Sequence, residues 1–225
     1  MKISFKFLAA ALAIVVLSGC ATKAPAPYDY TEFKLSKPKS ILVLPPINKT
    51  PEVRAPYSML AQVTYPLAES GYYVLPVSLV DETLKENGVT QAQDAHELPS
   101  AKLREIFGAD AVLYIAMTQY GTVYQVLDSH TTVTAEARLV DLKTDKVLWT
   151  GNASASTAEQ QNQQQGGLAG MLITAIIKQI VSTVSDESHP MAGLASRRLL
   201  SAGRFHGLLH GPRSPYYGKE DEKSR

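Results

Sequence analysis

The feature that most constrains the fold of this chain is a change of pattern near residue 109. Between residues 40 and 108 short apolar runs alternate with segments of helical spacing, whereas between 109 and 157 one strand-like segment follows another. Alternation of strands with helices is typical of parallel strands, and strands joined by short turns are typical of antiparallel ones. The sequence therefore predicts an α/β protein with α+β character. We expect a mixed sheet in the order βαβα(α)β, followed by a long antiparallel ribbon.

The first half of the predicted sheet consists of strands that are apolar on both faces. Residues 41–44 are apolar without interruption, and further strands are predicted at 72–78 and 109–121. Such runs are typical of strands that are covered on both sides. Helices that would supply this cover are predicted at 57–70, 79–88 and 101–107.

The second half of the predicted sheet has one wet face. A strand is predicted at 122–128, and the longer segment 131–142 alternates with a period of two before a turn and a partner strand at 146–157. One face is expected to carry Val133, Ala135, Ala137 and Leu139, and the other Thr132, Thr134, Glu136 and Arg138. This pattern predicts a ribbon that packs on a core with one side only. Trp149, the single tryptophan, is interpreted as a core residue rather than a ligand platform.

Two helices are predicted after the ribbon, and we expect both to pack on the sheet. The first, at 168–185, is strongly apolar, but Lys178 near its middle argues against a membrane span because a charge there is costly in lipid. Its residues Ile173, Ile177, Ile180 and Val184 recur at four-three-four spacing, as in a packing seam. The seam would serve either the core of this chain or the association of two copies. The second helix begins near Pro190 and ends before Gly203.

The N-terminus has the pattern of a secretory signal. Two lysines precede an uncharged apolar run at 7–17, which is shorter than the roughly 20 residues that span a bilayer. The residues LSGC at 17–20 resemble the bacterial lipobox. This resemblance implies cleavage between Gly19 and Cys20 and acylation of Cys20, the only cysteine. The alternative is an ordinary signal peptide with an incidental cysteine.

These features divide the chain into four parts. We expect a signal peptide at 1–19, the lipidated cysteine and a flexible tether at 20–39, a single globular domain at 40–203 and an irregular tail at 204–225. A flexible tether of this length spans on the order of 25 Å. Ala21 follows the cysteine, and in bacterial lipoproteins a residue other than aspartate at this place implies the outer membrane.

Composition excludes several kinds of partner and chemistry. Removal of residues 1–19 leaves 20 basic and 21 acidic residues, so the mature chain lacks the basic bias of a nucleic-acid-binding protein. Acylation of Cys20 leaves no thiol for a disulfide, a metal site or a nucleophile. We therefore expect the membrane, through the lipid, to be one partner and nucleic acid to be none.

The remaining motifs do not assemble into a catalytic set. His206 and His210 have the spacing of two ligands on one helix face, but the glycines beside them argue against a helix. The segment 128–130, Asp-Ser-His, fits a turn better than a triad, whose members meet through the fold. No nucleotide-binding motif follows a strand. We expect no catalytic residue, no metal, no cofactor and no enzymatic activity.

Four passages of the sequence resemble a known family. They read FGADAVLYIAMTQYG, ARLVDLKTDKVLWTGNA, HPMAGLASRRLL and HGLLHGPRSPYYG. Together they resemble the neisserial-type bacterial lipoprotein family of unassigned function, which is similar in fold to the curli-secretion lipoprotein and to the N-terminal domain of the Tol-system translocation protein. The resemblance implies a non-enzymatic part of the cell envelope.

Two functional hypotheses follow. The first is an outer-membrane-anchored periplasmic lipoprotein that serves as a structural or adaptor component of an envelope transport, export or assembly system, as a homo-oligomer or within a protein complex. The alternative is a small-molecule-binding or hydrolytic envelope protein. Its pocket would lie at the strand ends, among Tyr72, Tyr73, Tyr120 and Tyr124.

Overall fold

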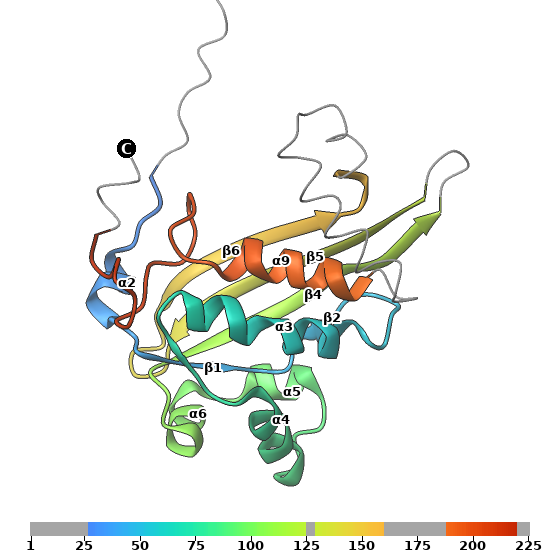
Figure 1. Ribbon diagram of the computed structural model, residues 1–225. Helices are drawn as coiled ribbons and strands as arrows, with labels where there is room; N and C mark the ends of the chain where they lie inside the picture. Colours follow the sequence, from blue (N-terminus) through green and yellow to red (C-terminus); the bar gives the residue numbers. More distant parts are fainter. Residues whose placement is uncertain (1–26, 125–128, 160–187, 220–225) are drawn as a thin grey trace, which may run out of the picture.

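The computed structural model describes residues 27–124, 129–159 and 188–219 (Figure 1). Their strands form one mixed sheet in the order β3-β1-β4-β5-β6, with β2 beside β4. The strands are β1 (Ser40–Val43), β2 (Ile47–Asn48), β3 (Tyr73–Val74), β4 (Ala111–Tyr124), β5 (Ser129–Asp141) and β6 (Val147–Ser156). β1 is parallel to β3 and β4, whereas β4, β5 and β6 are antiparallel. The predicted mixed sheet is therefore confirmed.

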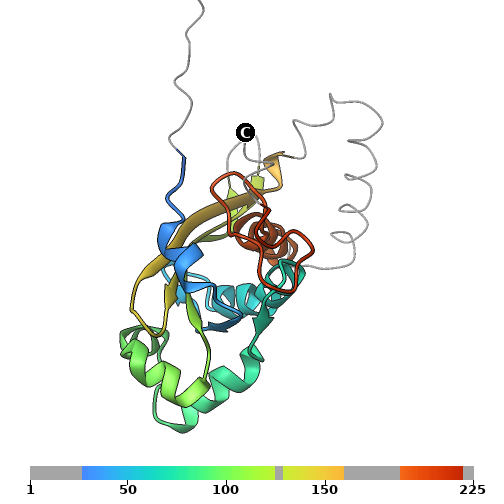
Figure 2. The ribbon, with the colours of Figure 1, turned by 90° about the vertical axis from the view of Figure 1, so that its left-hand side faces the viewer.

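Helices cover the sheet on both sides. In the part of the chain that the structure describes they are α2 (Thr31–Ser36), α3 (Ala55–Glu69), α4 (Val77–Glu86), α5 (Ala92–Glu97), α6 (Ser100–Phe107) and α9 (Ser188–Leu200). Figure 2 shows α3 and α9 side by side on one face, with α4, α5 and α6 toward the other. The two faces enclose separate hydrophobic cores.

The larger core lies between the sheet and the pair α3 and α9. It contains the inward side of β5 that the sequence predicted, Val133, Ala135, Ala137 and Leu139, and it also contains Trp149. The outward residues of β5 are half-buried or exposed, as in a ribbon with one wet face. The period-two pattern was therefore interpreted correctly.

The merging of two predicted strands and one additional helix distinguish the structure from the prediction, and one predicted helix is not described. The segments predicted as strands at 109–121 and 122–128 form the single strand β4, which runs through Gly121 to Tyr124. The polar stretch before α6 contains the short helix α5, because Ala95 is buried in the smaller core. Of the two predicted C-terminal helices the structure describes α9, and the segment 168–185 with its seam residues lies outside the described residues.

Part of the predicted tether belongs to the folded structure. Helix α2 lies within 20–39, and its Phe33 is 3% exposed in the larger core. Tyr28, still nearer the N-terminus, donates or accepts hydrogen bonds with Thr150 on β6 through its hydroxyl. The chain is thus attached to the sheet from residue 28 onward.

The described part of the C-terminal tail, residues 204–219, is irregular, and three aromatic side chains hold it on the core. Tyr30 donates its hydroxyl hydrogen to the carbonyl of Gly207 and Tyr72 to that of Leu209, each at 2.6 Å. The indole N–H of Trp149 donates to the carbonyl of His206 at 2.9 Å. We call these three side chains the tail clamp. They give buried backbone carbonyls the partners that a strand or helix would otherwise supply.

The turn between β5 and β6 depends on Asp141. Its carboxylate accepts hydrogen bonds from the backbone N–H groups of Lys143 and Thr144 at 2.8 and 2.7 Å, and from the Ser36 hydroxyl of α2. Burial raises the pKa of the Asp141 carboxyl, but the bonds from Ser36, Thr144 and Lys143 outweigh burial and hold the pKa below its usual range.

We expect Asp141→Asn to lower the free energy of unfolding by about 1–3 kcal/mol at pH 7, because the amide accepts fewer and weaker bonds. A carboxyl whose pKa is depressed by folding stabilises the protein above its unfolded pKa, and this contribution disappears as the pH falls through the folded pKa. The difference between the two proteins should therefore shrink below about pH 4. Urea unfolding at a series of pH values measures it. Asp94→Asn on the surface of α5 is the control, and parallel pH curves for wild type and Asp141→Asn would contradict the assignment.

Candidate functional site

A groove of about 710 Å³ lies between α5 and the antiparallel ribbon, and we call it the groove beneath α5. Its floor comes from β4, β5 and β6 and its wall from β2, the residue after it and α5. The lining residues are Ile47, Lys49, Gln93, His96, Glu97, Tyr114, Ile115, Ala116, Glu136, Ala137, Arg138, Thr150, Gly151 and Asn152. The groove forms because the short helix α5 covers only part of this sheet face.

Strand register brings the polar residues of the groove together. Glu136 lies opposite Ala116 on β4 and Asn152 on β6, and Arg138 lies opposite Tyr114 and Thr150. Residues directly opposite on one face of a sheet are neighbours. The small side chain of Ala116 leaves the space that the larger polar side chains surround.

Tyr114, Arg138 and His96 form a stacked group in the groove. The guanidinium carbon of Arg138 lies 4.2 Å from the Tyr114 ring centroid, which is a cation–π contact, and the His96 ring meets the same tyrosine edge-on at 5.1 Å. His96 Nε2 donates to the Pro45 carbonyl at 3.0 Å. These contacts fix the orientation of Arg138 before any ligand binds.

Burial keeps two of these groups uncharged. It lowers the pKa of His96, with the charge of Arg138 acting in the same direction against the Pro45 carbonyl. It also raises the pKa of the Tyr114 hydroxyl. At neutral pH the charges of the groove therefore come from Lys49, Arg138 and the glutamates at 97 and 136. Within the described residues no ion pair joins these four to one another, so their charges are available to a partner.

Hydroxyl groups extend this surface along the ribbon. Thr134 lies 3.0 Å from the Ser154 hydroxyl and 2.9 Å from the Gln119 side-chain oxygen, to which it donates. Thr132 donates to the Ser156 hydroxyl at 3.1 Å. These hydroxyl groups make this part of the face polar and suited to a hydrated contact.

One serine–histidine contact invites comparison with a catalytic pair. His189 Nδ1 on α9 lies 2.8 Å from the Ser58 hydroxyl on α3, and His189 Nε2 lies 2.8 Å from the Gln62 amide nitrogen. Because that nitrogen only donates, Nε2 is the acceptor and the ring proton is on Nδ1, which donates to Ser58. A general base must accept the serine proton, so this arrangement joins α3 to α9 instead of activating Ser58.

The predicted tyrosine pocket is not formed by its four residues. Tyr72 belongs to the tail clamp and Tyr120 to the larger core. Tyr73 lines a second, smaller groove of about 480 Å³ at the other edge of the sheet. The side chain of Tyr124 lies outside what the structure describes. The groove beneath α5, and not a cluster of these tyrosines, is therefore the place where a small molecule could bind.

The other sequence candidates fall in different places. Gly19, Cys20 and the seam residues Ile173, Ile177, Ile180 and Val184 lie outside the described residues. His206 stacks on Phe205, whereas the Nδ1 atom of His210 lies 3.0 Å from the Ser214 hydroxyl. In the ranges 27–124, 129–159 and 188–219 no group of three His, Cys, Asp or Glu side chains is close enough to hold a metal ion. None of the helices described there has both the length and the apolar character needed to cross a bilayer.

Comparison with known proteins defines the class to which this fold belongs, a lipoprotein with an α/β domain. A family model described as "Putative lipoprotein GNA1162-like" matches residues 28–213. The chain belongs to this GNA1162-like lipoprotein family, and the resemblance identified from the sequence is confirmed.

Two relatives come from Neisseria meningitidis. The chain is 48% identical over 201 residues to "Putative lipoprotein NMB1124/NMB1162" of the serogroup B strain, covering 89% of this chain and 93% of the relative. The crystal structure of lipoprotein GNA1162 shares 51% identity with a TM-score of 0.52, over 64% of this chain and 99% of that one. Neither description names an enzymatic activity.

A more distant likeness is to a PelC dodecamer from Paraburkholderia phytofirmans. It shares 14% identity with a TM-score of 0.41, over 74% of this chain and 91% of the PelC chain. At this level of similarity the dodecamer is a property of PelC alone.

Proposed function

We propose that the protein is an outer-membrane lipoprotein, anchored through acylated Cys20 and facing the periplasm, that acts as a non-enzymatic adaptor in an envelope transport, export or assembly system. Membership of a lipoprotein family and the LSGC sequence at 17–20 support the anchor. Ala21 after the cysteine supports the outer membrane.

The groove beneath α5 is the observation that supports an adaptor. It offers two basic and two acidic side chains, a tyrosine floor and a polar extension along the ribbon. Arg and Tyr are enriched at the centres of protein interfaces, and complementary charges set specificity. The partner that fits is a protein segment that carries both acidic and basic side chains.

The outer edge of β6 is already occupied by hydrogen bonds from other parts of the chain, which supports binding at the groove instead of at this edge. The Tyr28 hydroxyl accepts from the backbone N–H of Thr150 at 2.8 Å, Arg198 donates to the Ser154 carbonyl at 2.7 Å, and Glu159 accepts from the N–H of Ser156 at 3.0 Å. A strand that joined this edge would have to displace all three bonds.

Charge reversal in the groove tests this proposal. We expect the double variant Glu136→Lys, Arg138→Glu to recover at least about tenfold less partner than wild type after crosslinking in native membranes, because close charge pairs at interfaces couple strongly. Quantitative mass spectrometry of the pull-down measures the recovery. Both side chains are exposed, so the variant should fold like wild type.

Two comparisons complete the experiment. Arg104→Glu on exposed α6 changes a charge outside the groove and should leave recovery unchanged. Cys20→Ala should release the protein from the membrane fraction and lose the partner as well. Undiminished recovery with the groove variant would refute the groove as the docking site, and absence of any specific partner in all samples would refute the adaptor function.

The volume of the groove favours one second candidate, a binder of a small polar ligand. At about 710 Å³ it lies within the range of small-molecule sites. Native mass spectrometry of the purified protein separates the two functions. A small molecule that copurifies with wild type and is lost with the groove variant would favour the binder.

Self-association through Ile173, Ile177, Ile180 and Val184 remains part of the proposal. Size measurement of the chain over a range of concentrations tests it, with Ile177→Asp as the variant that would disrupt the seam. A strictly monomeric wild type at high concentration would remove the self-association.

A further inference from the structure

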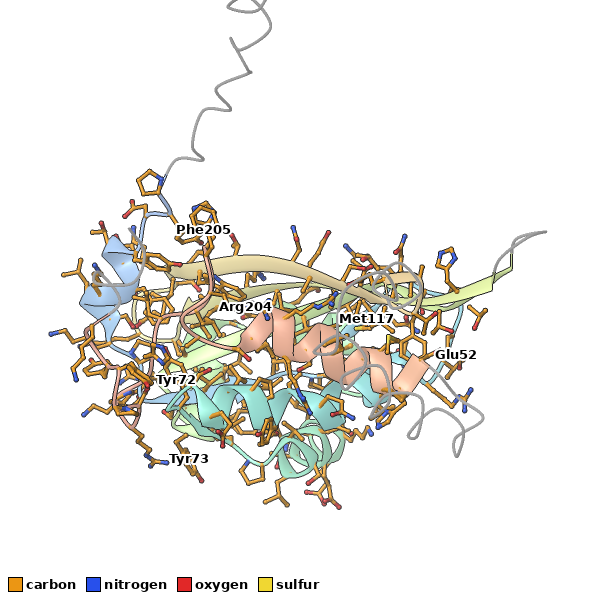
Figure 3. The ribbon with its side chains drawn as sticks, turned by 45° about the horizontal axis from the view of Figure 1, so that its top comes forward. Glu52, Tyr72, Tyr73, Met117, Arg204 and Phe205 are labelled. Atoms are coloured by element: carbon orange, nitrogen blue, oxygen red, sulfur yellow. The ribbon has the colours of Figure 1, made fainter. Side chains whose placement is uncertain are left out.

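The end of the molecule where the described chain begins, at residue 27, carries an exposed aromatic side chain, Phe205. Figure 3 shows Phe205 at the end from which the N-terminal segment leaves, with Glu52 at the opposite end of the long sheet. Phe205 is 69% exposed, although the carbonyl of the next residue, His206, is hydrogen-bonded to Trp149 of the tail clamp. Single exposed apolar side chains are common, so the exposure of Phe205 gains meaning only together with its fixed position, the length of the tether and the charge around it.

Ring contacts hold Phe205 in its position, so its exposure is not that of a residue in a loose loop. Its ring stacks on His206 with centroids 3.9 Å apart, and His206 lies 5.8 Å from Tyr28. Tyr28 is bonded to β6, and the His206 carbonyl is bonded to Trp149. The loop that presents Phe205 is therefore attached to the sheet.

The tether brings this end close to the bilayer. Seven residues lie between Cys20 and Tyr28, and at full extension the eight Cα–Cα steps bridge at most about 28 Å. A domain of this size is on the order of 40 Å across. Phe205 lies at the end of the sheet where the described chain begins, and Glu52 lies at the far end (Figure 3). Anchoring through Cys20 by so short a segment favours the end of Phe205 as the one that meets the lipid.

The charge at this end suits an anionic surface. The described tail, 203–219, contains Arg204, Arg213 and Lys219 and no acidic residue. The segment 27–39 adds Lys34, Lys37 and Lys39 against Asp29 and Glu32. Basic side chains near anionic headgroups and aromatic rings at the level of the headgroups both favour attachment to a membrane surface.

We propose that Arg204 and Phe205 form a headgroup-contacting surface that docks the domain on anionic lipid and fixes its orientation at the membrane. Phe205 enters the headgroup region and Arg204 pairs with phosphate. This inference rests on the proposed lipid anchor at Cys20.

Bromolipid quenching of tryptophan fluorescence tests the surface on the full-length acylated chain in vesicles of phosphatidylcholine and phosphatidylglycerol. Native Trp149 is buried and supplies a constant background. We expect the Phe205→Trp variant to be blue-shifted and quenched by brominated lipid, and the matched Val53→Trp variant at the far end to be quenched no more than wild type. Val53 is 81% exposed and is followed by Arg54, so this site also places an exposed apolar residue next to an arginine.

Charge reversal supplies the second measurement. Arg204→Glu in the Phe205→Trp background should weaken docking by about fivefold or more, since each basic residue near an anionic membrane contributes about that factor. Arg54→Glu should have no effect. Equal quenching of the Phe205→Trp and Val53→Trp variants, or quenching that ignores Arg204→Glu, would overturn the proposal.

Flotation of the same vesicles separates this proposal from the anchor on which it depends. Protein that fails to float refutes the lipid anchor, whereas protein that floats without quenching of the Phe205→Trp variant refutes docking alone. A blue shift that needs a membrane-protein extract and no quenching by lipid would assign the surface to a protein partner and would also overturn the proposal.

Discussion

We expect replacement of Trp149 by alanine to lower the free energy of unfolding by about 3–5 kcal/mol, because a large aromatic residue is removed from a closed core. The side chain is 1% exposed, and its loss also leaves the half-buried His206 carbonyl without the indole N–H. Denaturant unfolding followed by circular dichroism measures the change, since the variant lacks its only tryptophan.

Two further variants identify which part of the indole matters. Trp149→Phe keeps most of the apolar contact but loses the hydrogen bond, so it should cost about 1–3 kcal/mol. Val147→Ala on the same strand is the control, because Val147 is 48% exposed, and it should stay within about 0.5 kcal/mol. A loss below 1 kcal/mol for Trp149→Ala would contradict the role of the tail clamp.

The second large effect is expected from Gly71→Ala. Gly71 has φ +94°, and a Cβ there would lie 2.5 Å from the backbone nitrogen of Ser214 and 2.8 Å from the carbonyl oxygen of Gly211. Both neighbours are backbone atoms of the tail, so the tail must move. Backbone strain and overpacking together should cost about 2–4 kcal/mol. We expect the variant to be cut faster by trypsin after Arg213, which limited proteolysis measures.

Gly88→Ala separates strain from crowding. Gly88 also has a positive φ, +83°, but a Cβ there would meet nothing within 4 Å. It should cost only about 1 kcal/mol and leave tail cleavage unchanged. If both glycine variants behaved alike, the close approach of residue 71 to the tail would not be what the position requires.

The strands of the sheet were predictable because their patterns are local. The apolar run at 41–44 and the period-two alternation at 133–139 indicate burial on two faces and on one face, and the structure places them so. Helix α5 was not predictable from its polar sequence, since Ala95 becomes apolar cover only when the smaller core surrounds it. The same holds for Phe33 in the predicted tether.

A contact within β6 explains the spacing of Trp149 and Gly151. A Cβ on Gly151 would lie 2.2 Å from the indole ring, so the glycine provides the space in which that ring lies. The sequence presents this spacing as part of a family resemblance without the reason. Residues two apart on a strand share a face, and the structure adds that the indole ring lies over residue 151.

The candidate site was predictable in part. The wet face of β5, with Glu136 and Arg138, follows from alternation alone. The register that places Tyr114 and Asn152 beside them does not, and neither does the position of His96 on α5. The groove forms between elements that are far apart in sequence, and local sequence patterns do not indicate which of these elements come together.

By itself the sequence determined the class of the protein and its mixed sheet, because signal, strand and helix patterns depend on the order of neighbouring residues. It also supports the anchor at Cys20 as a prediction that the structure does not describe. Only the tertiary structure decided that the chain is attached to the sheet at Tyr28, that aromatic hydroxyl and indole groups hold the tail, and that a charged groove lies beneath α5. These features join residues up to 177 positions apart. Such contacts depend on packing of the whole chain.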